Sequence, residues 1–177
     1  MQMKKMGQMG SIGFIVFTLI FPFLVAGLAH ASGWVWQNPL PQGNELTGVW
    51  GSSGNDVFAV GNETILHYNG SSWSIMMSGT TPWLVGVWGS SASDVFAVGQ
   101  FGTILHYNGS SWSTMSSGTT TRLSAVWGSS GNDVFVVGSS GTILHYDGSS
   151  WSAISSGTTD DLNGVWGSSG SDVFAVG

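Results

Sequence analysis

Leu46-Thr47-Gly48-Val49-Trp50-Gly51 opens a phrase that occurs four times in the chain. Its second half returns as Val87-Trp88-Gly89, Val126-Trp127-Gly128 and Val165-Trp166-Gly167, at a nearly constant spacing. Two further phrases keep the same period: Asp-Val-Phe-(Ala/Val)-Val-Gly begins at Asp56, Asp94, Asp133 and Asp172, and Thr-Ile-Leu-His-Tyr begins at Thr64, Thr103 and Thr142. A fixed period of about 39 residues indicates a repeat architecture, in which neighbouring units bury a shared core.

Each unit contains four short segments with strand character, separated by turn signals. In the second unit we expect strands at Leu84–Trp88, Asp94–Val98, Thr103–Tyr107 and from Ser111 to about Ser116. The third and fourth strands are joined by Asn69-Gly70, Asn108-Gly109 and Asp147-Gly148 in successive units. These dipeptides reach the positive φ values that tight hairpins need, so each unit is predicted to be an antiparallel meander.

The strands differ in polarity, and the difference predicts their order. The second strand reads Val-Phe-Ala-Val and is apolar on both faces, which indicates cover on both sides. The fourth strand alternates and is the most polar, so we place it outermost. Four antiparallel strands in each repeat describe a blade of an all-β, β-propeller fold. A β-solenoid is the alternative, but its rungs are usually shorter.

The predicted boundaries follow the repeat: blade 1 at 46–83, blade 2 at 84–122, blade 3 at 123–161 and a partial blade 4 at 162–177. Trp36 stands before Trp50 at nearly the same sequence separation as Trp73 before Trp88. We therefore expect residues 32–45 to donate an outer closing strand to the last blade. Blade 4 still lacks its third strand. This incomplete ring favours a partial sequence from a longer propeller; otherwise further blades or another chain must close it.

The N-terminal segment, up to Ala31, has the layout of a secretory signal peptide. Lys4 and Lys5 precede an apolar run over residues 12–29, and Ala29-His30-Ala31 predicts cleavage after Ala31. An uncleaved membrane anchor is the alternative, because the run approaches the length of a bilayer span. Either way we expect export, to a secreted, periplasmic or cell-surface location. The chain has no cysteine, so no disulfide stabilises it there.

Charge excludes two classes of partner. After Ala31 the only cationic side chain is Arg122, against nine acidic residues. Nucleic-acid binding needs Lys or Arg to replace counterions at phosphates, and adsorption to an anionic membrane needs the same charge. We therefore expect no nucleic-acid partner, and no membrane partner once the signal peptide is removed.

The repeated phrases resemble a known group of propellers. The order Leu-x-(Gly/Ala)-Val-Trp, Asp-Val-Phe-x-Val-Gly, Gly-Thr-Ile-Leu and Asn-Gly-Ser-Ser-Trp is similar to BNR/Asp-box repeats, above all those of photosystem II stability/assembly factor-type and secreted bacterial repeat proteins. The Asp-box itself is degenerate, since a Tyr stands at its Asp position. The resemblance covers residues 36–177 and implies four-stranded blades with a binding or assembly role.

Two repeated polar residues invite a metal hypothesis. His67, His106 and His145 fall on the third strand of successive blades, which lie too far apart for ligands that must converge at about 2 Å on zinc. We expect each histidine to pack or hydrogen-bond within its own blade. The repeated aspartates, at Asp56, Asp94, Asp133 and Asp172, would offer calcium one carboxylate per turn, which is too few. We favour a role in which each carboxylate accepts hydrogen bonds from the turn backbone. No metal or cofactor is expected.

The tryptophans form two repeated sets and one exception. Trp50, Trp88, Trp127 and Trp166 lie on the first strands, and Trp73, Trp112 and Trp151 begin the fourth strands. Packing between blades is favoured for both sets, although stacking on sugars is the alternative and tectonin-type lectins carry comparable Val-Trp-Gly phrases. Trp83 and Phe101 break the repeat at loop positions. Together with Arg122 they are our candidate ligand-binding residues.

Catalysis has little support in the sequence. Sialidases of related architecture need an arginine cluster and a Tyr–Glu pair, whereas this chain offers Arg122, with Glu45 and Glu63 at unrelated positions of the repeat. We expect an exported, non-enzymatic propeller that serves as a scaffold for protein binding, adhesion or assembly, with a protein or a cell-surface glycan as partner. A carbohydrate-binding propeller is the alternative. A fragment of a sialidase-like glycoside hydrolase is less favoured.

Overall fold

The computed structural model describes residues 4–5, 35–36, 44–78 and 83–177. Contacts divide the chain into one unit of residues 2–39 and a second of residues 40–177 with Met1. In the first unit, β1 (Lys4–Lys5) pairs antiparallel with β2 (Val35–Trp36). The rest of the predicted signal peptide and most of the predicted closing strand lie outside the described residues, so both stay predictions. No helix among the described residues has the length and apolar character to cross a bilayer.

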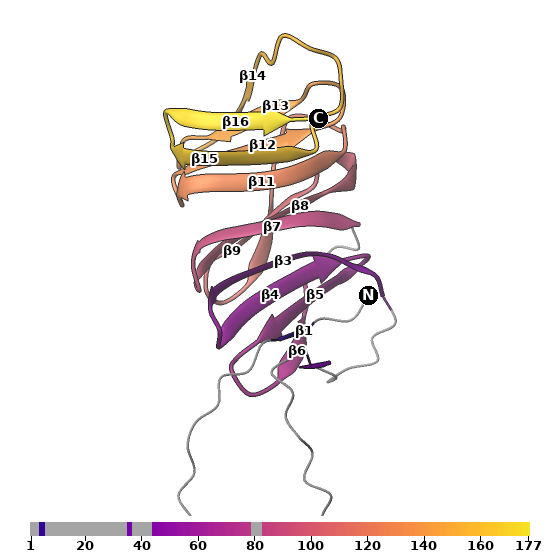
Figure 1. The fold of residues 1–177 in the computed structure, drawn as a ribbon, viewed down its shortest axis with the longest axis vertical. Coiled ribbons are helices and arrows are strands. Elements are labelled where there is room, and N and C mark those ends of the chain that lie inside the picture. Colours follow the sequence, from indigo (N-terminus) through magenta and orange to yellow (C-terminus); the bar gives the residue numbers. More distant parts are fainter. Residues whose placement is uncertain (1–3, 6–34, 37–43, 79–82) are drawn as a thin grey trace, which may run out of the picture. The chain divides into compact units, whose positions relative to one another are not determined.

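The second unit consists of three four-stranded antiparallel sheets and one two-stranded sheet (Figure 1). Blade 1 contains β3 (Leu46–Ser53), β4 (Asp56–Gly61), β5 (Thr64–Tyr68) and β6 (Trp73–Met76). Blade 2 contains β7 (Leu84–Ser91), β8 (Asp94–Gly99), β9 (Ile104–Tyr107) and β10 (Trp112–Met115), with a 3₁₀ turn η1 (Gln100–Gly102) between β8 and β9. Blade 3 contains β11 (Leu123–Ser130), β12 (Asp133–Gly138), β13 (Ile143–Tyr146) and β14 (Trp151–Ile154). The two-stranded sheet contains β15 (Gly164–Ser169) and β16 (Asp172–Val176).

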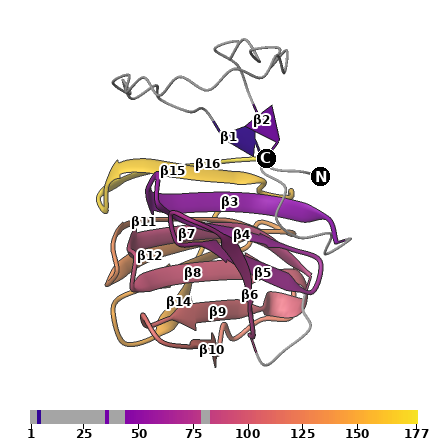
Figure 2. The ribbon, with the colours of Figure 1, turned by 90° about the horizontal axis from the view of Figure 1, so that it is seen from below.

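The order of strands within and between sheets is that of a β-propeller. Each sheet follows chain order, so the first strand lies at one edge and the polar fourth strand at the other. The first strands β3, β7, β11 and β15 contact one another in sequence, and both views show them side by side (Figures 1 and 2). The predicted fold is confirmed: three full blades and two strands of a fourth. The solenoid alternative is wrong.

The Val-Trp-Gly phrase joins each blade to the next. A Cβ atom built on Gly89 would lie 2.7 Å from Cη2 of Trp50, so the indole of blade 1 rests directly on the glycine of blade 2. The same contact recurs between Trp88 and Gly128, and between Trp127 and Gly167, where the Cβ distance is 2.6 Å in both cases. The glycine is therefore required at this position because any side chain would overlap the ring. Trp50, Trp88 and Trp127 therefore pack between blades, the favoured role of the first-strand tryptophans, whereas Trp166, the fourth of the set, is exposed.

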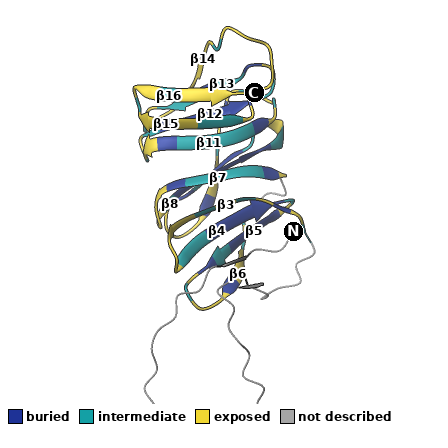
Figure 3. Cartoon of the chain, viewed as in Figure 1, coloured by how far each residue is buried: buried dark blue, intermediate teal, exposed yellow. Residues whose placement is uncertain are grey.

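The second strands form the core. Phe58, Ala59 and Val60 in blade 1, and residues 95–98 in blade 2, are fully buried, as Figure 3 shows in dark blue. Each phenylalanine also contacts the following blade. The ring of Phe58 lies 5.5 Å from Tyr107 and 6.1 Å from Trp112, and Phe96 makes the same two contacts with Tyr146 and Trp151. The apolar run on both faces of this strand thus serves two interfaces at once.

The last sheet is the exposed end of this core. Trp166 is 60% exposed, Phe174 58% and Val176 66%, although their counterparts in the preceding blades are buried or half-buried. β14, the outer strand of blade 3, is likewise mostly exposed. The difference follows from position in the repeat, because among the described residues no third or fourth strand lies beside β16 and no further first strand lies beside β15.

Candidate functional site

One polar group recurs at the same place in each full blade and joins three strands. The hydroxyl of Ser52 donates to Oδ2 of Asp56 at 2.6 Å, and Nε2 of His67 lies 2.6 Å from Oδ1 of the same carboxylate. Blade 2 repeats the group with Ser90, Asp94 and His106, and blade 3 with Ser129, Asp133 and His145. The aspartate therefore links the first strand of its blade to the third.

The strand register explains why these residues meet. Phe58 lies opposite His67 in the β4–β5 pair, and Asp56 is two residues before Phe58, so all three side chains project from one face of the sheet. The imidazole stacks on the phenyl ring with centroids 4.5 Å apart. The pairs Phe96–His106 and Phe135–His145 have the same separation of 4.5 Å. Each histidine is thus held by a ring on one side and a carboxylate at its edge.

The group is structural in geometry rather than catalytic. Nucleophilic catalysis by serine needs the histidine to contact the hydroxyl, with the aspartate behind the histidine. Here serine and histidine bind opposite oxygens of one carboxylate, and the serine proton points to the aspartate. The hydroxyl of Ser129 and, less strongly, His145 hold the pKa of Asp133 below its usual value. Each histidine therefore makes its hydrogen bond within its own blade, as expected. The aspartates were expected to accept bonds from the turn backbone; the bonds given for the described residues come instead from a serine hydroxyl and the histidine.

Metal binding has no support at these positions. Among the described ranges, no three His, Cys, Asp or Glu side chains gather closely enough to hold an ion. Each blade brings together one carboxylate and one imidazole, and both already satisfy each other. Zinc and calcium require more ligands than this pair provides.

The opposite end of the blades carries the residues that do not repeat. In an antiparallel meander the turn between second and third strands lies at the same end as the loop between blades, and hydrogen bonds join them here: the backbone N–H of Gln100 donates to the carbonyl of Trp83 at 3.0 Å, and that of Ser139 to Arg122 at 2.9 Å. We call the exposed non-repeating positions at this end the variable rim. It comprises Glu45, Trp83, Arg122 and Asp161 before the first strands, and Glu63, Phe101 and Ser140 in the turns.

Phe101 is the most unusual residue of the variable rim. Its φ is +57°, in the left-handed region that a bulky L-residue rarely adopts, and 77% of its surface is exposed. Glu63 and Ser140 have φ values of +52° and +55° at the equivalent positions, so the turn itself demands this conformation. Phe101 thus combines backbone strain with an aromatic ring in solvent, and neither stabilises the blade.

A cleft of about 600 Å³ lies beside Phe101, lined by residues 101–103 and 114–120. A cleft of about 550 Å³ occupies the equivalent place in blade 3, lined by Gly141 and residues 154–160. The loops that form these clefts are fixed by hydrogen bonds. The N–H of Gly102 donates to the carbonyl of Thr121 at 2.8 Å, and that of Gly141 to Asp160 at 2.7 Å. The clefts are therefore built by ordered backbone.

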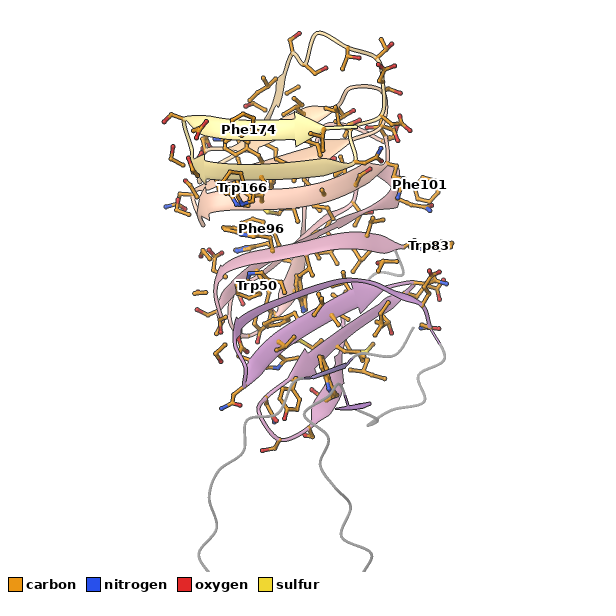
Figure 4. The ribbon with its side chains drawn as sticks, viewed as in Figure 1. Trp50, Trp83, Phe96, Phe101, Trp166 and Phe174 are labelled. Atoms are coloured by element: carbon orange, nitrogen blue, oxygen red, sulfur yellow. The ribbon has the colours of Figure 1, made fainter. Side chains whose placement is uncertain are left out.

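The structure places the three candidate residues at one end of neighbouring blades. Trp83, which is 41% exposed, and Phe101 project on the same side of the stack (Figure 4). Arg122 occupies, one blade further, the position equivalent to Trp83, and it is exposed. Their role in binding stays a prediction. Glu45 and Glu63, which occupy unrelated positions of the repeat, lie at the same end of blade 1, since the backbone N–H of Asn62, the residue before Glu63, donates to the carbonyl of Glu45 at 2.9 Å.

The pairing of the repeated aspartate with the repeated histidine was not predicted from the sequence. The available signal is that both residues recur in all three full blades, on two strands that a short hairpin turn joins.

The chain is similar in fold to known propellers. No family model and no curated protein sequence matches the chain. Among solved structures, YCF48 from Cyanidioschyzon merolae matches with a TM-score of 0.62 at 12% identity, over 74% of this chain and 47% of that one. A structure of YCF48 bound to D1 peptide matches with a TM-score of 0.64 at 14% identity, over 82% and 51%. The chain thus spans about half the length of these propellers, and they confirm the resemblance to photosystem II assembly factor-type repeats at the level of fold.

Proposed function

We propose that this chain is an exported, non-catalytic β-propeller scaffold that binds a segment of another protein at its variable rim. The observation that carries the proposal is Phe101, an aromatic side chain 77% exposed and held with φ at +57° at the edge of a cleft. Aromatic anchors beside a pocket are the residues that contribute most to protein interfaces. A position that costs stability and buries nothing is expected where a ligand supplies the compensation.

Internal variation supports the same location. The blades are nearly identical in their cores and at the Ser–Asp–His end, yet the positions at Trp83, Phe101 and Arg122 differ from their counterparts in every other blade. A scaffold that binds one partner needs distinct contacts from successive blades, whereas a lectin with one site per blade would repeat them. The variation therefore favours a single, extended partner over several equivalent sugars.

The clefts suit a polypeptide segment. Those of blades 2 and 3 have similar volumes, about 600 and 550 Å³, and polar loops line both. Two such clefts occur in successive blades, and Phe101 provides an exposed apolar side chain at the edge of the first. One of the solved propellers of similar fold is a complex, YCF48 bound to D1 peptide.

The test is selection of ligands from a displayed library of random peptides against the full chain, followed by affinity measurement with single variants. Phe101→Asn removes the ring and keeps a residue that tolerates the left-handed region. Trp83→Ser removes the second aromatic. We expect each to weaken binding of the selected peptides at least about tenfold. Ile75→Ser is the matched control, because Ile75 is an exposed apolar residue, 55% accessible, in the middle of β6.

Two results would overturn the proposal. If the selected peptides bind the Phe101→Asn variant as tightly as the unaltered chain, the binding site lies outside the variable rim. If the chain binds sugars on a glycan array and the Phe101→Asn variant does not, the partner is a carbohydrate rather than a protein. Export is tested separately by measuring the mass of the mature protein in its native cell fractions, where loss of the segment up to Ala31 is expected.

A further inference from the structure

The outer strand of blade 2 has one edge without a strand partner. β10 is last in the order β7-β8-β9-β10, and no described strand pairs with its other side (Figure 2). An edge of this kind presents backbone N–H and C=O groups that another extended segment can pair with. Blade 2 has all four strands and lies between blades 1 and 3, so this open edge is a feature of a complete blade.

The hairpin between β9 and β10 shows which backbone groups face the open side. The backbone N–H of Asn108 donates to the carbonyl of Ser111 at 3.3 Å, so the backbone groups of Ser111 point toward the preceding strand. In an antiparallel ladder, successive residues face their neighbour alternately, and β10 pairs with β9 without a register shift. The N–H and C=O groups of Trp112, Thr114 and Ser116 therefore point to the open side. They repeat at intervals of about 7 Å, two residues of extended chain, which is the spacing of another strand's backbone.

The chemistry of β10 leaves this edge accessible. Proteins commonly protect an open edge with charged side chains, proline or a β-bulge. Residues 112–116 read Trp-Ser-Thr-Met-Ser, without charge or proline, and the side chain of Thr114 is exposed. The strand is only four residues long. Backbone bonds alone would therefore hold a partner weakly, and stable binding needs a further contact.

The cleft beside Phe101 supplies such a contact at the end of this edge. Residues 114–120, which include the end of β10, line the cleft together with residues 101–103 of the turn between β8 and β9. Phe101, which is 77% exposed, projects there (Figure 4). The loop after β10 is ordered, since the hydroxyl of Ser117 donates to the carbonyl of Thr119 at 3.2 Å and accepts from its N–H at 3.3 Å. A segment paired along β10 thus leads directly into a fixed cleft.

On the basis of the proposed function, we infer that the bound protein segment is an extended strand that pairs with the outer edge of β10. Its backbone bonds to the outward groups of Trp112, Thr114 and Ser116. Beyond Ser116, one apolar side chain of the segment enters the cleft and packs on Phe101. Strand addition of this kind takes its affinity from main-chain bonds and its specificity from a pocket for a side chain.

The turn residue explains why the segment chooses blade 2, although each full blade has an outer strand at the end of its sheet. Blade 3 has a cleft of nearly the same volume, but Ser140 stands at the position of Phe101. In blade 1 the position is held by Glu63. The edges of β6 and β14 therefore lack the apolar contact that a short edge strand needs.

The test uses the full chain and those peptides from the library selection whose binding depends on Phe101. In each peptide the backbone N–H groups are replaced one at a time by N-methyl groups, which removes a single donor. We expect methylation to weaken binding about tenfold or more at every second residue of a run and to have little effect at the residues between. A peptide bound in a helical or irregular conformation would show no such alternation.

Thr114→Pro tests the same contact from the side of the protein. Proline removes the N–H that points to the open side and leaves the bonds to β9, so the variant should fold, which thermal unfolding verifies. We expect it to bind the selected peptides about tenfold more weakly. Ala153→Pro is the matched control, because Ala153 has the equivalent place on β14, and this variant should bind as the unaltered chain does.

Hydrogen exchange measured by NMR gives a readout that needs no variant. Binding of a selected peptide should slow exchange at the amides of Thr114 and Ser116, which point to the open side. The amides of Ser113 and Met115 face β9 and should change little.

Three outcomes would overturn the inference, and they can be told apart. If no selected peptide depends on Phe101, the proposed function fails and the inference fails with it. If binding depends on Phe101 but N-methylation shows no alternation and the two outward amides exchange as before, the site stands and strand addition is wrong. If sedimentation shows a dimer that Thr114→Pro dissociates, the edge is occupied by a second copy of the chain.

Discussion

The two ends of the blades are built from the same strands, yet they use their residues differently. At the end where first strands turn into second strands, Ser–Asp–His groups recur in every full blade with nearly the same distances. At the other end Trp83, Phe101 and Arg122 have no repeated counterpart and are exposed. Side-chain hydrogen bonds thus recur at the repeated end, whereas at the variable rim the backbone bonds recur and the side chains differ. Substitutions at the two ends should separate stability from binding.

The largest effect is expected from Gly128→Ala, close to the repeated end. The added methyl group would lie 2.6 Å from Cη2 of Trp88 and 2.9 Å from the carbonyl of Asp133, so the blades must move apart. We expect a loss of about 1–3 kcal/mol in the free energy of unfolding, measured by urea denaturation. Gly54→Ala is the control, since nothing lies within 4 Å of its Cβ position. If Gly128→Ala and Gly54→Ala lowered the free energy of unfolding equally, the tryptophan–glycine contact would not explain why glycine recurs at this position.

Asp94→Ala should cost somewhat less, about 1–2 kcal/mol, because it removes hydrogen bonds from Ser90 and His106 at a partly exposed site. Denaturation of Asp94→Ala, His106→Ala and the double variant measures the coupling. The double variant should be little worse than either single one. Full additivity would mean that the two side chains act independently.

Phe101→Asn should leave stability unchanged or raise it by about 0.5–1 kcal/mol, since asparagine adopts positive φ more readily than phenylalanine. Thermal unfolding of the variant provides the measurement. This is the reverse of the expectation for the two substitutions at the repeated end. A marked loss of stability would make Phe101 a structural residue and would erase the contrast between the two ends.

The smallest effect is expected from Asp147→Asn. Hydrogen bonds from the Ser150 backbone N–H and from the Ser149 hydroxyl and N–H lower the pKa of Asp147 to about 2 from 3.8. Because the folded-state pKa is depressed, the carboxylate's contribution is complete above pH 3.8 and disappears as the pH falls through about 2. Asn69 and Asn108 accept the same backbone bonds in blades 1 and 2, so the variant should match the unaltered chain at pH 7. Acid titration monitored by tryptophan fluorescence should show that Asp147→Asn loses less stability than the unaltered chain between pH 3.8 and about 2.

Much of the fold could be predicted because the repeat supplies its own internal comparison. The second strand predicted at Asp94–Val98 is observed at Asp94–Gly99, and the fourth, predicted from Ser111, begins at Trp112. First strands were predicted too short, ending at Trp88 rather than Ser91, because Gly-Ser-Ser reads as a turn in isolation. The ladder continues through those residues because Ser91 lies opposite Asp94.

The candidate site was harder to predict, for a physical reason. Repetition identifies residues that every blade needs, and ligand contacts are the residues that differ. Trp83 and Phe101 could be singled out as exceptions, but the left-handed conformation of Phe101 depends on a turn whose geometry the residue itself does not favour. Trp83 and Arg122 each directly precede the leucine of a first strand, so their equivalence is readable in the sequence, whereas the cleft beside Phe101 depends on the loop backbone.

The contact between tryptophan and glycine has a direction. Each blade offers an indole on one flank and a bare backbone on the other, so units of this kind add in a single orientation, head to tail. Gly51 is exposed at the start of this series and Trp166 at its far end, each with half of the contact. Whole units can therefore be gained or lost by duplication without any new interface having to evolve. The number of blades in a closed ring is then set by the angle between neighbouring blades, because the contact between them is always the same.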